Sequence, residues 1–256
     1  MSEPQYTGVR VVVPISGGKD SQACLKLALG SYSRGEVLGL FCDTNFEHPL
    51  TYKHLDTIRS MYGVRIHTVS AGNVPDKVLK YGRFPGGGAR FCTDELKIIP
   101  GKKFYKALAE SQGHGFEVWY GVRGSESPER AKRYKGKVSD EVYTPHEFMS
   151  KYPKYLETLG VAIRLPIVDW STAEVLEFLA GEENPLYGEG FDRVGCFPCL
   201  AGGDASKIKA FEFDTFGAKQ YANVQVLEKA IGKSVFRSGI GPKWEQEGNG
   251  CSFCSM

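Results

Sequence analysis

The stretch PISGGKDS, residues 14–21, decides the fold. It follows the apolar run VRVVV (9–13) and leads into the helix-like segment SQACLKLAL (21–29). A buried strand, a glycine-rich turn and a helix in that order are typical of proteins in which parallel strands alternate with helices. Pro14 lacks a backbone donor, so we expect the first strand to stop pairing there.

The same alternation continues through the first two thirds of the chain. It predicts an α/β fold, with a Rossmann-like parallel sheet and helices on both faces. We expect a nucleotide-binding domain over residues 1–165 and a helical, cysteine-bearing C-terminal region over 166–256. Ser171, with Glu174 three residues later, has the spacing of a capping box before a helix. The further predicted strands are 36–44, 64–70 and 116–123, and the further predicted helices are 21–33, 50–63 and 103–113.

Composition restricts the class of protein. The 256 residues are 41% hydrophobic and 24% charged, with a formal net charge of +2, which is typical of a globular protein without a strong overall attraction to nucleic acid. No run approaches 18 apolar residues, and the N-terminus MSEPQYTGVR is unlike a signal peptide. We therefore expect a cytoplasmic protein with no membrane partner.

The glycine-rich turn is a candidate phosphate site. It matches neither the Walker loop nor the dinucleotide fingerprint G-x-G-x-x-G. Backbone N–H groups of such a turn, at the start of a helix, point toward an anion. Lys19 adds a positive charge, the two serines add hydroxyl donors, and Asp20 is a candidate for supporting Mg²⁺. The predicted site comprises Ser16, Gly17, Gly18, Lys19, Asp20 and Ser21.

Two further motifs fall at predicted strand ends. Asp43 and Thr44 end one strand, and Gly121-Val122-Arg123 ends another. Ligands of parallel sheets collect at the carboxyl ends of the strands, so these residues and the turn should line one crevice. The pattern leaves open whether Glu47 lies in that crevice or on the surface. The cations that follow Arg123 over 132–137 fit a solvated face or contacts to phosphates.

The string SGGKDS also matches the pyrophosphate loop of the ATP pyrophosphatase (PP-loop) superfamily. Residues 8–200 resemble the phosphoadenosine phosphosulfate (PAPS) reductase family within it. The resemblance implies an adenine nucleotide in the crevice, with its phosphates on residues 16–21. It places Arg123 and Arg130 near the phosphate or sulfate end, and Asp43 and Thr44 near the nucleotide. Its motifs, in order, are FCDTNFEHPLTYKHLD (41–56), RFCTDELKIIP (90–100), GVRGSESPER (121–130), LPIVDWSTAEVLEFL (165–179) and NPLYGEGFDRVGCFPC (184–199).

The seven cysteines are unevenly arranged. Cys24 and Cys42 lie in apolar stretches and fit small buried side chains. A single Cys92 and two CxxC pairs indicate metal, cluster or redox chemistry in a reducing compartment. The pairs are Cys196–Cys199 and Cys251–Cys254.

The family resemblance assigns these cysteines further. It implies a 4Fe-4S cluster on Cys92, Cys196 and Cys199, although relatives that carry the cluster have two adjacent cysteines where this chain has only Cys92. The tail would then supply Cys251 or Cys254 as the fourth ligand, and Cys254 is placed in the predicted set. Four thiolates would hold zinc equally well, and a redox or structural CxxC pair also stays open.

Three functions compete. In the first, ATP with Mg²⁺ adenylates an acceptor, pyrophosphate leaves, and a sulfur donor completes a thiolation, with tRNA, DNA or a small molecule as the acceptor. In the second, adenylyl sulfate (APS) or PAPS is reduced to sulfite by Cys251 or Cys254, with a thioredoxin-like reductant. In the third, a non-catalytic protein binds a nucleotide. The resemblance favours the first, because reductase loops typically lose the lysine–aspartate pair that Lys19 and Asp20 preserve, and Lys19 and Asp20 are then catalytic.

Overall fold

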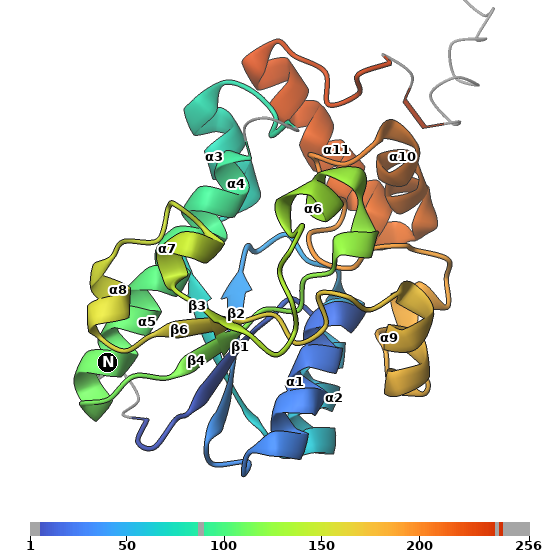
Figure 1. The fold of residues 1–256 in the computed structure, drawn as a ribbon. Helices are drawn as coiled ribbons and strands as arrows, with labels where there is room; N and C mark the ends of the chain where they lie inside the picture. Colours follow the sequence, from blue (N-terminus) through green and yellow to red (C-terminus); the bar gives the residue numbers. More distant parts are fainter. Residues whose placement is uncertain (1–5, 87–89, 239–240, 243–256) are drawn as a thin grey trace, which may run out of the picture.

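The computed structural model describes residues 6–86, 90–238 and 241–242, and Figure 1 shows their arrangement around a twisted sheet. In this part of the chain the sheet has six strands in the order β3-β2-β1-β4-β6-β5. All neighbours pair in parallel except β5, which is antiparallel to β6 at the edge. The strands are β1 (Val11–Ile15), β2 (Val37–Asp43), β3 (Arg65–Ser70), β4 (Glu117–Trp119), β5 (Val142–Tyr143) and β6 (Ala162–Arg164).

Helices cover both faces of this sheet, so the predicted fold class is confirmed. The helices are α1 (Lys19–Ser31), α2 (Pro49–Tyr62), α3 (Val74–Tyr81), α4 (Phe91–Thr93), the π-helical turn η1 (Asp94–Ile98), α5 (Ile99–Gln112), the 3₁₀ turn η2 (Gly124–Glu126), α6 (Pro128–Arg133), α7 (Pro145–Phe148), α8 (Tyr155–Thr158), α9 (Thr172–Leu179), the 3₁₀ turn η3 (Pro185–Tyr187), α10 (Asp204–Phe213) and α11 (Thr215–Ile231).

The apolar run of β1 feeds two cores. Val11 and Val13 are fully buried against α1 and α2, whereas Val12 is fully buried against α5 on the opposite face. A strand buried on both faces reads as a continuous apolar run, because alternate side chains point to opposite sides. This is why the strand was recognisable from its sequence.

Two details differ from the sequence-based expectation. Pairing of β1 continues past Pro14, which lies opposite Leu40 of β2, so the expected stop is wrong on that side. On the other side, the register with β4 covers only Val11 and Val12, so the missing Pro14 donor falls beyond the paired region. The strand predicted over 116–123 is also shorter, because the chain leaves the sheet after Trp119.

The chain after β6 is helical where the structure describes it. Ser171 caps α9 and forms the predicted capping box with Glu174. Helices α10 and α11 pack with α3 and α4 around a third core at the upper part of Figure 1. Within the described residues, no helix combines the length and apolar character needed to cross a membrane. The division of the chain near residue 165 stays a prediction.

Candidate functional site

The turn between β1 and α1 is shaped by its own side chains. Ser21 Oγ donates to the Gly18 carbonyl at 2.9 Å and accepts the Ser16 N–H at 3.2 Å. Gly17 has a φ of +76°, and an added Cβ there would lie 2.6 Å from the Thr51 side chain. A left-handed residue under a close neighbour favours glycine. The turn therefore holds its backbone donors at the amino end of α1.

Lys19, the first residue of α1, is a buried cation. Its side chain is 6% exposed, and burial lowers its pKa. Nζ donates to the Asp192 carbonyl at 3.3 Å and lies 4.5 Å from the centre of the Tyr187 ring. No carboxylate among the described residues forms an ion pair with it, although Asp20 and Glu126 favour its charge from a greater distance.

Residues 184–195, which we call the strap, lie across this turn. The Tyr187 hydroxyl accepts the backbone N–H of Lys19 at 3.0 Å. The Asn184 amide donates to the Gly17 carbonyl at 3.1 Å, and an added Cβ on Gly18 would lie 3.1 Å from the Tyr187 hydroxyl. The sequence offered no local signal for Tyr187, because its role depends on a contact 168 positions away.

Arg123 meets Asp20 in the interior. The Arg123 side chain is almost fully buried, and its Nε donates to Asp20 Oδ1 at 2.7 Å. Nη1 donates to Ser125 Oγ at 2.8 Å and to Thr172 Oγ1 at 3.2 Å. The two motifs predicted to share a crevice are therefore in contact. Protein partners thus engage both Nε and Nη1 of Arg123, which is the arrangement expected of a residue that positions the loop.

Arg130 lies on α6, close to the same charges. Its guanidinium pairs with Glu126, the residue whose charge also reaches Lys19. Ser127 caps α6 by accepting the backbone N–H of Arg130. Arg130 is thus linked to Lys19 through Glu126, which neutralises the Arg130 charge in this arrangement.

The side chains of Asp43 and Thr44, at the end of β2, point to different surroundings. Asp43 Oδ1 accepts the Tyr52 hydroxyl and the Asn45 N–H, both at 2.8 Å. Thr44 is fully buried, with its hydroxyl 3.2 Å from the Cys196 sulfur. Asp43 faces a cavity of about 150 Å³, whereas Thr44 is directed toward the thiols. The residues that line this cavity are Phe41, Asp43, Tyr52, Leu55, Asp56, Arg59 and Thr68.

Two further charged residues, the buried Glu47 and the half-buried Lys97, lie near the predicted residues, and the sequence did not identify them as site residues. Glu47 is 3% exposed and accepts from the Thr44 hydroxyl at 2.6 Å and from the Tyr52 hydroxyl at 3.2 Å. The charge that Cys196 carries when ionised raises the pKa of Lys97, and Glu47 acts in the same direction. Acid and base thus lie beside one thiol, although they are 50 positions apart in the sequence.

Three of the predicted cysteine ligands lie on the same side of the molecule. Cys196 pairs as a short β-bridge with Glu47, while Cys199 is exposed two residues beyond Phe197. Burial raises the pKa of Cys196 to about 11, and the Lys97 charge opposes this. Burial also raises the pKa of Cys92, with a smaller contribution from the charge of Cys199.

These thiols do not form a finished metal site. In the described part of the chain, no three His, Cys, Asp or Glu side chains are arranged to hold a metal ion. Cys251 and Cys254, the candidates for the missing ligand and for the nucleophile, lie outside the described residues. Asp20 Oδ1 accepts from Arg123, and a role of Asp20 in supporting Mg²⁺ stays a prediction.

The two other cysteines are structural. Cys24 is fully buried, and its thiol donates to the Trp119 carbonyl at 3.3 Å, as expected for a small buried side chain. Cys42 is half-buried and packs against the core on the α5 side of the sheet. Burial raises its pKa to about 11.

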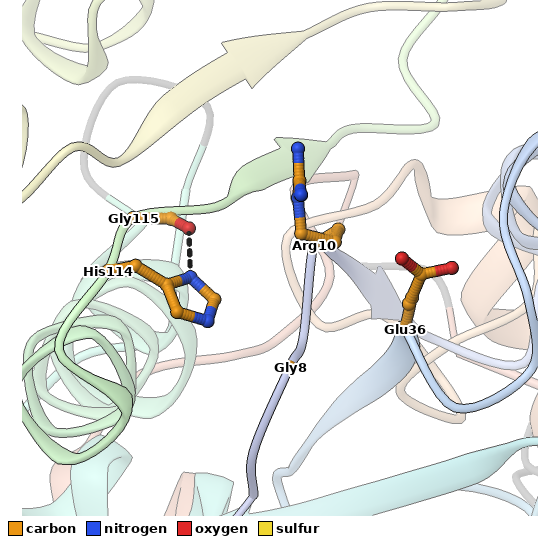
Figure 2. Close-up of a pocket in the computed structure, with 5 residues that line it drawn as sticks. All are labelled: Gly8, Arg10, Glu36, His114 and Gly115. Carbon is orange, nitrogen blue, oxygen red and sulfur yellow. Dashed lines mark hydrogen bonds between the residues drawn. The ribbon is translucent and has the colours of Figure 1, made fainter.

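A separate cavity of about 400 Å³ lies at the opposite edge of the sheet. Figure 2 shows its lining residues, with a hydrogen bond between His114 Nδ1 and the Gly115 carbonyl. Arg10 precedes β1 and Glu36 precedes β2, so this cavity is at the amino ends of the strands. Ligands of such sheets bind at the carboxyl ends, where the turn at residues 14–21 lies.

Comparison with known proteins agrees with this architecture. A family model described as the phosphoadenosine phosphosulfate reductase domain matches residues 10–201. An uncharacterized protein of Methanocaldococcus jannaschii is 30% identical over 243 residues, 93% of this chain but 45% of that protein, so the chain spans about half the length of this relative. The adenosine 5'-phosphosulfate reductase of Rhodococcus erythropolis is 26% identical over 169 residues, 63% of this chain and 58% of the reductase.

Two solved structures are similar at low identity. The PAPS reductase of Candida auris is 16% identical with a TM-score of 0.47, covering 77% of this chain and 83% of that one. The U34-tRNA thiolase NcsA of Methanococcus maripaludis, with its [4Fe-4S] cluster, is 15% identical with a TM-score of 0.47, covering 92% and 77%. Because the family model matches well over half of the sequence, the chain belongs to the phosphoadenosine phosphosulfate reductase domain family.

Proposed function

We propose that this protein binds ATP at residues 16–21, transfers the adenylyl group to an acceptor and releases pyrophosphate in support of sulfur transfer. The observation that carries the proposal is Lys19, a buried cation at the start of α1 without a carboxylate ion pair among the described residues. Buried charges are normally paired, because leaving water is costly for an ion. A polyphosphate on the loop would supply the missing counter-charge.

The geometry suits departure of pyrophosphate. The acceptor oxygen would attack the α-phosphorus of ATP, and the bond from that phosphorus to the oxygen bridging to the β-phosphate would break. Negative charge then develops on the leaving pyrophosphate. Lys19 and the N–H groups at the amino end of α1 would stabilise that charge. Arg123 would act indirectly, by holding Asp20 and thereby the first turn of α1.

The thiols would serve the sulfur step. A sulfur nucleophile displaces AMP from the adenylated acceptor, forming the carbon–sulfur bond as the carbon–oxygen bond breaks. Cys92, Cys196 and Cys199, together with Cys254, are our proposed ligands of an iron–sulfur cluster, and the cluster would hold the transferable sulfur. Cysteine thiolates are the ordinary ligands of such clusters. The sulfur donor and a nucleic-acid acceptor, tRNA or DNA, belong to the same proposal.

Sulfonucleotide reduction is the second candidate. Its support is the relation to adenosine 5'-phosphosulfate reductases together with the cysteine-bearing tail. In that reaction a tail thiolate attacks the sulfur of APS or PAPS and releases the nucleotide. A thioredoxin-like dithiol then supplies the two electrons that release sulfite. The intact Lys19–Asp20 pair favours ATP over this candidate.

Pyrophosphate release from Mg·ATP by the anaerobically purified protein tests the proposal. Separate reactions contain cell RNA or DNA as acceptors, and parallel reactions contain APS or PAPS with thioredoxin. We expect pyrophosphate and AMP, with release lost in Lys19→Met. Lys53→Met, an exposed lysine on α2, is the matched control and should behave like the unchanged protein.

The alternatives give different products. Sulfite without pyrophosphate, abolished by Cys251→Ser or Cys254→Ser, would make this protein a reductase. ATP binding that yields neither product with any acceptor would identify a nucleotide-binding protein without this chemistry.

A further inference from the structure

The strap occupies the donors that a phosphate would need. The backbone N–H of Lys19 is one of the unpaired donors at the start of α1, and the Tyr187 hydroxyl accepts it at 3.0 Å. The Lys19 ammonium donates to a carbonyl of the same segment, that of Asp192, at 3.3 Å. Two oxygens of the strap thus accept the backbone N–H of Lys19 and one of the three N–H donors of its ammonium.

We propose that the strap is a built-in competitor of the phosphate ligand, with Tyr187 as the residue that sets the threshold for binding. The hydroxyl and the carbonyl stand where oxygens of a bound polyphosphate would accept. Nucleotide phosphates must displace them, so part of the binding free energy goes into moving the strap. This inference rests on the proposed phosphate site and adds a selection step to it.

The contacts of the strap show that it is held at both ends. Near its start, the Asn184 amide donates to the Gly17 carbonyl, and the Gln22 side chain donates to the Glu182 carbonyl at 2.7 Å. Near its other end, the Lys209 ammonium of α10 donates to the Gly190 carbonyl and lies 4.8 Å from the Phe191 ring. Tyr187 lies between these anchors and is half-buried over the loop.

Such a cover favours ligands that replace both contacts together. One inorganic phosphate has a smaller charge and span than pyrophosphate, so it displaces the Tyr187 hydroxyl and the Asp192 carbonyl less effectively. Pyrophosphate, the group that ATP carries beyond its α-phosphate, provides two linked anionic centres. The strap therefore selects for polyphosphates over single phosphates.

Calorimetric titration with inorganic pyrophosphate and with inorganic phosphate tests the inference in the full chain. Tyr187→Phe removes only the hydroxyl, so we expect pyrophosphate to bind roughly two- to ten-fold tighter, the range that one net hydrogen bond covers. The preference for pyrophosphate over phosphate should shrink. Tyr32→Phe, at the far end of α1, is the matched control and should leave both affinities unchanged.

A second variant guards against a local folding defect. Lys209→Met removes the outer anchor without touching the loop, and it should also tighten pyrophosphate binding. Hydrogen exchange adds a direct readout, because Gly190 and Phe191 donate within the strap and should exchange faster with pyrophosphate bound. Weaker binding by Tyr187→Phe would show that the hydroxyl is a ligand. Unchanged affinity in both variants, or unchanged exchange, would also overturn the inference.

The result is separable from the proposed function. If the unchanged protein binds no pyrophosphate, the phosphate site itself fails. If it binds pyrophosphate and the two variants do not bind it more tightly, only the strap inference fails.

Discussion

Arg123 Nε donates to Asp20 Oδ1 at 2.7 Å, which joins the chain after β4 to the first turn of α1 across 103 positions of sequence. Both side chains lie largely out of water, Arg123 with 2% and Asp20 with 16% of the side chain exposed. A buried pair of this kind costs most when one partner is removed, because the other charge is left uncompensated.

Replacing Arg123 by methionine should therefore lower the free energy of unfolding by roughly 3–5 kcal/mol. Urea denaturation measures this change, and a double-mutant cycle with Asp20→Asn isolates the coupling between the two residues. Arg59→Met removes the exposed pair with Asp56 and should leave stability nearly unchanged. A loss below about 1 kcal/mol for Arg123→Met would contradict the structural role.

Gly121 gives a steric test of the same junction. A Cβ on Gly121 would lie 2.5 Å from the Asp20 carbonyl oxygen, a contact that the backbone cannot absorb without moving. Gly121→Ala should lower the melting temperature and weaken ATP binding together. Gly30→Ala, in the last turns of α1 where nothing lies within 4 Å, should be neutral or stabilising because alanine favours a helix. Equal melting temperatures for both variants would count against the close approach.

The fold could be predicted from the sequence because the signals for its strands and helices are local and repeated. The strand–turn–helix at residues 9–29 and the capping box at Ser171 each lie within one short segment, and the structure contains both. The edge strand β5 escaped prediction because Val142–Tyr143 is only two residues long, and its place depends on pairing with β6.

Only part of the candidate site could be predicted, again because local sequence signals do not report contacts between distant segments. The turn at residues 14–21 and Arg123 could be predicted because both lie at strand ends, and the structure shows that they are in contact. Tyr187, Glu47 and Lys97 could not be predicted, because their roles depend on interactions with segments distant in the sequence. In the sequence, Lys97 of the π-helical turn η1 cannot be distinguished from a surface lysine, and only the structure shows its interaction with Cys196.

Lys19 predicts a pH dependence. Burial lowers its pKa from the ordinary lysine value, so the free protein loses this proton at a lower pH than an exposed lysine does. Since the ammonium form attracts phosphate, kcat/KM for pyrophosphate release should fall as the pH rises. The midpoint of this fall should lie below the ordinary lysine pKa of about 10.4. Between the folded and unfolded pKa values the unfolded chain holds more protons, so the Lys19 contribution to stability rises with pH.

Lys19→Arg separates this effect from general alkaline inactivation. Arginine stays protonated, so the alkaline decline of kcat/KM should move to higher pH in any activity that remains. Lys53→Met should keep the decline of the unchanged protein. A pH profile that is the same in Lys19→Arg would assign the decline to another group.

The proposed iron–sulfur cluster can be tested by measuring the metal content of the protein. Iron and acid-labile sulfide measured on the anaerobically purified full chain should be present in near-equal amounts, with the visible absorption of a 4Fe-4S cluster. Cys92→Ser, Cys196→Ser and Cys199→Ser should each reduce both, because each removes a thiolate ligand. Cys24→Ala is the control, since Cys24 is fully buried on α1 and belongs to a different core from Cys92 and Cys196. Separate Cys251→Ser and Cys254→Ser variants would show which tail cysteine completes the ligand set, with loss of iron and sulfide expected for Cys254→Ser.

Two other outcomes would contradict the cluster. Stoichiometric zinc without iron would indicate a tetrahedral thiolate site for zinc instead. A metal-free protein with unchanged activity would leave Cys196 and Cys199 as a redox or structural pair.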